Sequence, residues 1–334
     1  MCVFSYRKAI KPAFSRYFLR MGAKVRIVLA LLLCLSVEAM AQNDVQFSDY
    51  TRLESYYNPA VSGIDGKLSI AGAYSMQFVG YDNAPATMYL GADLPVFFLG
   101  PRHGAGVSLL SDKFGIFTTQ KIGLQYAYNM KIGKKARLAI GVQGAILTEK
   151  IDPSGLKVKD QNDPALPSSE ANGQHVDFAA GIYFLHPKYW VGASSHHLMA
   201  PTILMQEKYE FSFDRMYYLM GGCNIRLKNT FLSLQPSFMV MTNMKHDWRE
   251  DIQCKLQYEF EGRSFYAGVG YSPDISATFM VGGNFHGVWL GYSYQMYTSG
   301  VGLINGSHEL TVGYQTDLDL FKKGRNRHKS VRFL

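Results

Sequence analysis

The sequence predicts an all-β fold, a transmembrane antiparallel β-barrel of about 14 strands whose two termini face the periplasm. Three observations favour this fold: an N-terminal secretory signal, a series of long alternating strands, and connections that alternate between long and short. The 334-residue chain contains 32 glycines, 22 tyrosines and 21 phenylalanines, and only 18% of its residues are charged. No segment after the N-terminal region spaces its apolar residues as a helix does, so we expect β structure throughout the body.

A secretory signal peptide is expected over residues 1–41. An apolar run over residues 27–37 follows basic residues, and Ala39 and Ala41 place small side chains where a signal peptidase cleaves. The apolar run is too short to cross a bilayer as a helix. Met21 is an alternative start of the chain, because a signal of ordinary length begins there.

Charge is concentrated at the two ends of the chain. The predicted signal carries seven basic residues and one acidic residue, so its removal lowers the net charge from +8 to +2. Six of the remaining basic residues lie in the last thirteen positions, within a tail over residues 317–334 that we expect in the periplasm. This tail is either a solvated terminus or a docking surface. The body between the ends is mildly acidic, which excludes a nucleic-acid-binding role.

Residues 42–66 are expected to form a periplasmic N-terminal segment, and its aromatic side chains indicate that it packs against another surface. A barrel over residues 67–316 follows. Its fourteen strand-like runs cover residues 67–79, 86–94, 102–112, 118–131, 136–147, 175–185, 189–197, 214–227, 230–241, 251–260, 264–271, 276–284, 287–297 and 307–316.

The runs alternate between apolar and polar residues, as strands with two different faces do. In the fourth run, Ile122, Leu124 and Tyr126 oppose Lys121 and Gln125. Many runs are nine to fourteen residues long, which suits tilted strands that cross a bilayer in about 9–11 residues. We therefore expect apolar side chains to face lipid and glycines and polar side chains to face the lumen.

The connections give independent evidence for a barrel. The fifth, seventh, ninth and thirteenth connections are long, whereas the fourth, sixth, eighth, tenth and twelfth are short. The second connection, residues 95–101, departs from this pattern. In an outer-membrane barrel the odd-numbered connections are extracellular and long, and the even-numbered ones are short periplasmic turns. The first connection contains turn residues over 82–85, which we expect to form a fixed extracellular loop. Pro236 lies inside the ninth run, where we expect a β-bulge.

Few residues suggest chemistry, and we predict no catalytic, cofactor-binding or metal-binding residue. Neighbours on a strand face opposite sides, so His196 and His197 cannot easily share one metal ion. No nucleophile elbow is present, which disfavours a hydrolase. Cys223 and Cys254 lie inside strands, where we interpret them as small apolar side chains in preference to a disulfide.

Charged side chains on inward positions are the remaining candidates for function. These are Asp112, Lys121, Lys131, Arg137, Asp177 and Glu309. Either they form a network that stiffens or plugs the barrel, or they line a selective pore. Bulky tyrosine and glutamine residues at inward positions favour partial filling of the lumen.

Short motifs occur in order along nearly the whole mature chain: Gln46-Phe47-Ser48, Asn58-Pro59-Ala60, Gln77-Phe78, Ala84-Pro85, Asp112-Lys113, Tyr126-Ala127-Tyr128, His197-Leu198, Pro236-Ser237, Gly291-Tyr292-Ser293-Tyr294 and Ser307-His308-Glu309. Together they resemble the PorP/SprF family of type IX secretion system outer-membrane proteins. Val45, Ser75 and Phe78 depart from that pattern, where proline, arginine and tryptophan are usual.

The resemblance implies a non-enzymatic protein of the Gram-negative outer membrane. It further implies partners, namely periplasmic and outer-membrane components of type IX secretion and secreted proteins with a C-terminal sorting domain, gliding adhesins among them. Two other functions stay open on the residues alone. One is a porin-like channel for small solutes, which needs an open lumen, and the other is an outer-membrane hydrolase.

Overall fold

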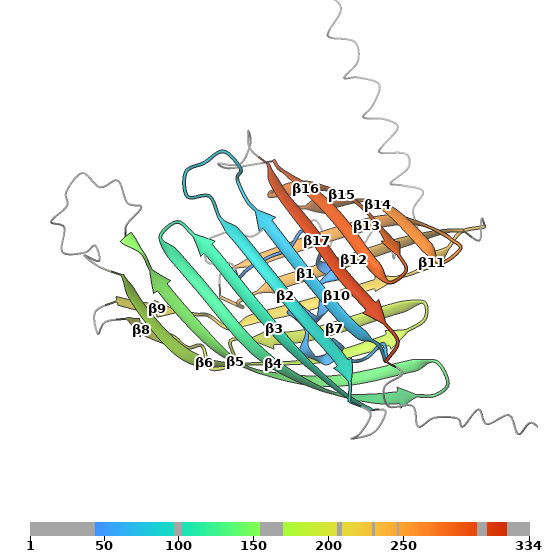
Figure 1. Ribbon diagram of the computed structural model, residues 1–334, viewed down its shortest axis with the longest axis horizontal. Coiled ribbons are helices and arrows are strands. Elements are labelled where there is room, and N and C mark those ends of the chain that lie inside the picture. Colours follow the sequence, from blue (N-terminus) through green and yellow to red (C-terminus); the bar gives the residue numbers. More distant parts are fainter. Residues whose placement is uncertain are drawn as a thin grey trace, which may run out of the picture. The chain divides into compact units, whose positions relative to one another are not determined.

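The computed structural model describes residues 44–96, 102–153, 170–205, 209–228, 231–245, 247–298 and 306–318. In this part of the chain, fourteen strands pair side by side in a closed antiparallel ring (Figure 1). The strands of the ring are β1 Leu68–Met76, β2 Ala86–Pro95, β3 His103–Phe114, β4 Phe117–Ile132, β5 Ala136–Ile151, β6 Ala171–His186, β7 Tyr189–His196, β10 Met216–Cys223, β12 Leu232–Thr242, β13 Trp248–Phe260, β14 Arg263–Ser272, β15 Ser276–Phe285, β16 Val288–Tyr297 and β17 Ser307–Thr316.

The ring closes where the first strand meets the last. β1 pairs with β2 on one side and with β17 on the other, and β10 pairs with both β7 and β12. Closure satisfies backbone groups that an open sheet would leave unpaired, and only closed β-structures do this in hydrocarbon. The prediction of an antiparallel barrel of about 14 strands is confirmed.

Short elements accompany the ring. Among the residues described from 44 onward, three short helices precede β1: η1 Tyr50–Arg52, α3 Glu54–Tyr57 and η2 Pro59–Val61. A separate hairpin, β8 Thr202–Met205 and β9 Tyr209–Ser212, lies between β7 and β10. No helix among the described residues is long and apolar enough to cross a membrane.

The two faces of the strands differ as their alternation predicts. Ile122, Leu124 and Val142 point outward and are more than half exposed. Lys121 and Gln125 point inward and are buried. The outer face therefore offers an apolar surface to lipid, while the polar side chains meet inside.

The connections divide the two ends of the barrel. Residues 77–85, 152–170, 197–215 and 298–306 connect strands at one end, which we name the long-loop end. Residues 133–135, 187–188, 261–262 and 286–287 connect strands at the other, the short-turn end. The third and eleventh connections, residues 115–116 and 273–275, are tight turns although they are odd-numbered. The N-terminal end of β1 and the C-terminal end of β17 both lie at the short-turn end.

Pro236 does not form the expected bulge. The pairs Gly222↔Ser237 and Ile225↔Leu234 keep one register across it, so neither strand gains a residue. Proline has no N–H to donate, and the ladder is simply interrupted opposite it. The partner strand is thereby divided into β10 and a short continuation, β11 Ile225–Arg226.

Candidate functional site: a protein segment in the lumen

Residues 44–66, which we call the lumen segment, run through the inside of the barrel. Near its start, Gln46 donates a hydrogen bond to Asp251, at the long-loop end of β13. Near its end, Ile64 accepts one from Arg137, at the short-turn end of β5. In Figure 1 the blue helices of this segment lie among the strands of the barrel. From the sequence, these residues were expected to precede the barrel and to pack through their aromatic side chains, but their enclosure by the barrel was not predicted.

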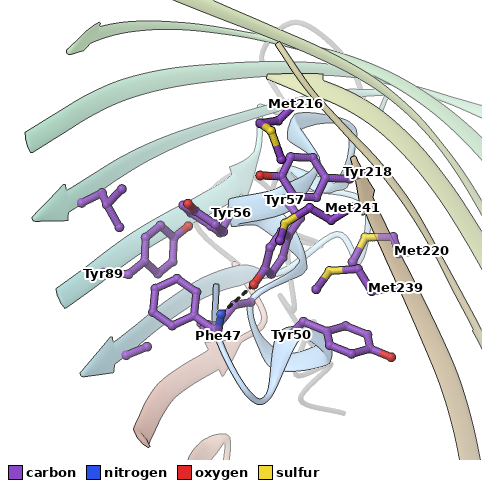
Figure 2. Packing of buried hydrophobic residues seen from close by; sticks show 13 residues of the cluster. Phe47, Tyr50, Tyr56, Tyr57, Tyr89, Met216, Tyr218, Met220, Met239 and Met241 are labelled. Carbon is purple, nitrogen blue, oxygen red and sulfur yellow. Dashed lines mark hydrogen bonds between the residues drawn. The ribbon is translucent and has the colours of Figure 1, made fainter. Parts of the chain in front are cut away.

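An aromatic cluster fills the lumen beside β2, β10 and β12. Phe47, Tyr50, Leu53, Tyr56 and Tyr57 of the lumen segment are all buried. They pack on inward-facing residues of the wall (Figure 2), namely Tyr89, Leu110, Met216, Tyr218, Met220, Met239 and Met241. Burial of each large apolar side chain is worth about 1.5–3 kcal/mol, so this cluster is a major source of affinity between segment and wall.

Rings within the cluster meet edge to face, which aromatic pairs prefer. The rings of Tyr56 and Tyr57 have centroids 4.8 Å apart, and those of Tyr56 and Tyr89 lie 5.2 Å apart. The Tyr57 hydroxyl accepts a 2.9 Å hydrogen bond from the backbone N–H of Phe47. This bond holds the segment in a folded turn, so the aromatic residues face the wall together.

A buried ion pair ties the segment to β13. The ammonium group of Lys255 contacts the carboxylate of Asp49, and their side chains are 5% and 0% exposed. Tyr266 donates to the same carboxylate at 2.9 Å, and Lys255 donates to Thr51 at 2.6 Å. Burial alone would raise the pKa of Asp49, but the positive charge of Lys255 outweighs that effect and lowers it. Asp49 therefore stays ionised and paired.

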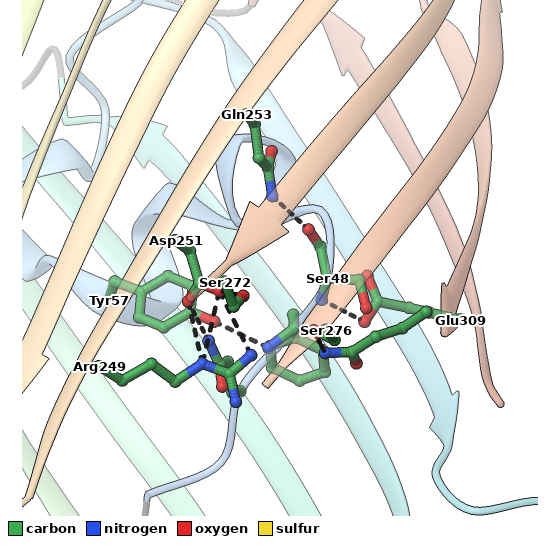
Figure 3. Close-up of polar contacts among 11 residues, drawn as sticks. Ser48, Tyr57, Arg249, Asp251, Gln253, Ser272, Ser276 and Glu309 are labelled. Carbon is green, nitrogen blue, oxygen red and sulfur yellow. Dashed lines mark hydrogen bonds and ion pairs between the residues drawn. The ribbon is translucent and has the colours of Figure 1, made fainter. Parts of the chain in front are cut away.

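A carboxylate of β17 forms hydrogen bonds with the same turn of the segment. Glu309 accepts hydrogen bonds from the backbone N–H groups of Ser48 and Asp49, at 2.6 and 2.9 Å. Gln253 donates to the Ser48 carbonyl oxygen, so both backbone groups of Ser48 are bound (Figure 3). Nearby, Asp251 binds Arg249 and Ser272. Strands far apart in sequence thus converge on a single turn.

Asp44, the first described residue of the segment, belongs to a second cluster of charged side chains. The carboxylate of Asp44 accepts a 2.6 Å hydrogen bond from Tyr218 and lies 3.6 Å from the Nε2 atom of His197. The Nδ1 atom of His197 lies 2.9 Å from Asp177, which also lies 3.5 Å from the ammonium group of Lys121. Two carboxylates therefore face two cationic partners.

The pKa values in this group follow from its charges. Burial lowers the pKa of His197, but the carboxylates of Asp177 and Asp44 outweigh burial and raise it. Burial would raise the pKa of Asp44, yet the hydrogen bond and charge of His197 hold it well below its usual range. The imidazolium and carboxylate forms stabilise each other at neutral pH.

The two neighbouring histidines serve different partners. His196 lies against the Tyr57 carbonyl oxygen at 2.8 Å, whereas His197 turns to Asp177. The two ring planes are inclined by 77°. Within the described residues, no group of three or more histidine, cysteine or acidic side chains is arranged to hold a metal ion.

Glycines in the wall make room for the segment. Asn58 accepts a hydrogen bond from Ala60 and donates one to the Ile182 carbonyl oxygen of β6 at 2.9 Å. A Cβ atom on Gly181 would lie only 2.1 Å from the Asn58 oxygen, and one on Gly141 would lie 2.4 Å from the Ala60 nitrogen. A side chain at either position would displace the segment.

The predicted inward charges are largely brought together. Asp177, Glu309, Lys121 and Arg137 contact the lumen segment or one another, as described above. Asp112 accepts a 2.5 Å hydrogen bond from Thr87 of the neighbouring strand. Lys131 is exposed near the end of β4 and joins none of these groups. This arrangement matches the first of the two alternatives, a hydrogen-bond and ion-pair network inside the barrel.

The sequence analysis missed the most buried anchor, Lys255 with Asp49. A lysine at an inward position of a strand was the available signal, because a buried ammonium group requires a partner. Cys223 and Cys254 are free thiols on β10 and β13, and β12 separates these two strands. The structure therefore agrees with their interpretation as unpaired side chains.

The chain is similar to one known protein family and to several solved structures. Residues 39–314 match the family described as "Type IX secretion system membrane protein PorP/SprF". No curated protein matches the chain. Among solved structures, a Pseudomonas aeruginosa FadL homologue is similar with a TM-score of 0.47 and 11% identity, over 80% of this chain and 94% of that one.

Two further solved structures show weaker similarity. The CymD monoaromatic hydrocarbon channel aligns with a TM-score of 0.44 and 11% identity, over 79% of this chain and 91% of that one. The KdgM porin aligns with a TM-score of 0.35 and 10% identity, over 74% and 98% of the two chains.

Proposed function

Because the chain belongs to the PorP/SprF family of type IX secretion system membrane proteins, we propose that it works by binding partner proteins during secretion. It is an outer-membrane component of that system. In this proposal it takes part in the export or surface placement of secreted proteins that carry a C-terminal sorting domain, including gliding adhesins. Its other partners are periplasmic and outer-membrane components of the same machinery.

The lumen segment is the observation that carries the proposal. A solute channel needs a continuous water-filled path lined by free polar groups. Here the inward polar groups of many strands bind residues of the chain itself: Gln125 of β4, Ser194 of β7, Ser237 of β12, Lys255 of β13 and Glu309 of β17. A barrel occupied in this way offers its ends and loops to partners.

Glycines in the barrel wall are further evidence that the lumen segment fills the lumen. Gly141 and Gly181 bring the backbone of β5 and β6 within van der Waals distance of Asn58 and Ala60. Close contact of this kind excludes water between segment and wall. A porin-like channel, the alternative function, would need the segment to leave.

Two experiments test the proposal together. In a planar bilayer, the purified protein should give no steady single-channel conductance. Cells lacking the protein should fail to place at least one sorting-domain protein on their surface, and complementation should restore it. Steady conductance of the unaltered protein, with an unchanged secreted and surface proteome in the deletion strain, would favour the channel and overturn the proposal.

A further inference from the structure

The wall of the barrel is uneven at the long-loop end. β6 begins at Ala171, but its pairing with β7 begins only at Ala180, opposite Ser195. After β7 the chain turns inward at His197, which has a φ of 53° and contacts Asp177. Among the residues that the structure describes, the first part of β6 therefore has no strand neighbour on its β7 side.

The backbone groups exposed along this edge can be identified. Leu198 donates a 3.0 Å hydrogen bond to the Phe178 carbonyl oxygen, so the backbone groups of Phe178 face the β7 side. Alternation along a strand then directs the N–H and C=O groups of Asn172, Gln174 and Val176 to the same side. Among the described residues no backbone group pairs with these three, and only the ring of His175 approaches the Val176 carbonyl oxygen.

This edge extends beyond the apolar outer band of the barrel. On neighbouring strands, Ile122, Ile146 and Val176 form an outward row of exposed apolar side chains. The next outward row toward the long-loop end is Gln120, Thr148 and Gln174, which is polar. Since lipid favours the apolar row and water the polar one, the β6 edge at Gln174 lies in water.

The inner face of the same part of β6 is already covered. Ile203 and Met205 of the β8–β9 hairpin pack with Leu147, Ile151 and Ala171 in a buried cluster. A Cβ atom on Gly173 would lie 2.5 Å from Ile203, so the hairpin contacts the inner face directly. Pairing with β5 and packing against the β8–β9 hairpin thus hold this part of β6 in place. The edge is therefore already ordered before a ligand binds.

A second copy of the chain cannot occupy this edge. Strands of outer-membrane barrels tilt by about 35–45° from the membrane normal. Two copies in one bilayer are related by a twofold axis along that normal, so their β6 strands would cross at about twice the tilt, far from the alignment that pairing requires.

The described residues of this edge carry few of the features that prevent a free edge from pairing. Natural sheets block free edges with lysine, proline, bulges or very short strands. Residues 171–178 contain neither lysine nor proline, and their register with β5 is unbroken. We propose that an extended segment of a partner polypeptide adds to β6 as a further strand, bound by the backbone of Asn172, Gln174 and Val176. This proposal rests on the partner-binding function above and assigns a surface to it.

Hydrogen exchange resolved to single amides tests the proposal directly. In the purified protein, stripped of partners, the amides of Asn172, Gln174 and Val176 should exchange quickly, while that of Gly173, paired with β5, exchanges slowly. In the complex extracted with mild detergent from native outer membranes, the three edge amides should exchange at least about tenfold more slowly.

A pair of variants links this protection to the backbone. Gln174→Pro removes an edge N–H that the barrel does not use, and Gln174→Ala keeps it. We expect the proline variant to lose the edge protection in the native complex and the alanine variant to keep it. Heat modifiability on a gel should show that both barrels are folded.

Each other outcome overturns the proposal. Slow exchange of the edge amides in the stripped protein would mean that the chain covers its own edge. Fast exchange in the native complex would mean that no strand adds there. If the edge stays unprotected while the deletion strain still loses a surface protein, the partner-binding function stands and only this surface is wrong.

Discussion

Replacement of Lys255 by methionine should release the lumen segment from its main polar anchor. The variant leaves the Asp49 carboxylate buried without its cation, and removal of one partner of a buried ion pair costs about 3–5 kcal/mol. Tyr266 and Thr51 still donate hydrogen bonds to Asp49, at 2.9 and 3.0 Å. We therefore expect the lower end of that range, about 3 kcal/mol, which is roughly a 150-fold shift toward the undocked segment.

The assay is hydrogen exchange within the segment itself. The amides of Tyr56 and Asn58 donate to Leu53 and Glu54 in the docked state, each at 2.9 Å. Their protection should fall by about 100-fold in Lys255→Met if exchange proceeds through undocking. Lys150→Met is the matched control, because Lys150 pairs with Glu170 on the surface, where the two side chains are 39% and 51% exposed. It should leave exchange in the segment unchanged.

A double variant separates the ion pair from simple loss of packing. Asp49→Asn with Lys255→Met removes both charges, so no unpaired charge stays buried, and protection should return to within about tenfold of the natural protein. Protection in Lys255→Met within about threefold of the natural value would refute this account. So would a loss of protection in the double variant equal to the sum of the losses in the two single variants.

Three further predictions concern other contacts of the segment. Gly181→Ala should displace Asn58 and raise exchange across residues 53–60, whereas Gly133→Ala, in a turn with free space around it, should affect only that turn. Burial raises the pKa of Glu54 to about 7 from 4.5, so docking should be strongest below pH 4.5 and weaken up to pH 7, by at most about 3 kcal/mol. Segment protection, corrected for intrinsic exchange, should fall from pH 5 to pH 8, and a flat profile would contradict this. Glu54→Gln should reduce that pH dependence in the same measurement.

Much of the barrel could be predicted from the sequence, because a strand between lipid and a polar lumen has to alternate. Inward Lys121 and Gln125 and outward Ile122 and Leu124 show that alternation, and the structure confirms it. The expected strand ranges agree with the observed ones to within a few residues for most of the ring. The exceptions have local causes, such as the missing N–H of Pro236, which divides one strand.

The lumen segment could not be predicted in the same way. Its helices are three or four residues long, too short to show a helical repeat of apolar residues. Its aromatic residues indicated packing but not the surface they meet, since that surface is assembled from strands spread along the chain, from Tyr89 of β2 to Met241 of β12. The separate β8–β9 hairpin was missed for a similar reason, because each of its strands has only four residues. The signal peptide and the basic tail lie outside the described residues, and both stay predictions.

The position of the segment in the chain constrains how the protein assembles. Residues 44–66 lead directly into β1, and β1 forms the seam with β17, the last of the described strands. Closure of that seam with the segment outside would require it to be threaded afterwards through a finished ring, with Phe47, Tyr56 and Tyr57 passing a wall already packed with methionines. Entrapment during closure avoids this barrier. We therefore expect the segment to lie in the lumen before the ring closes, so that the inward faces of the strands pack on it as the barrel forms.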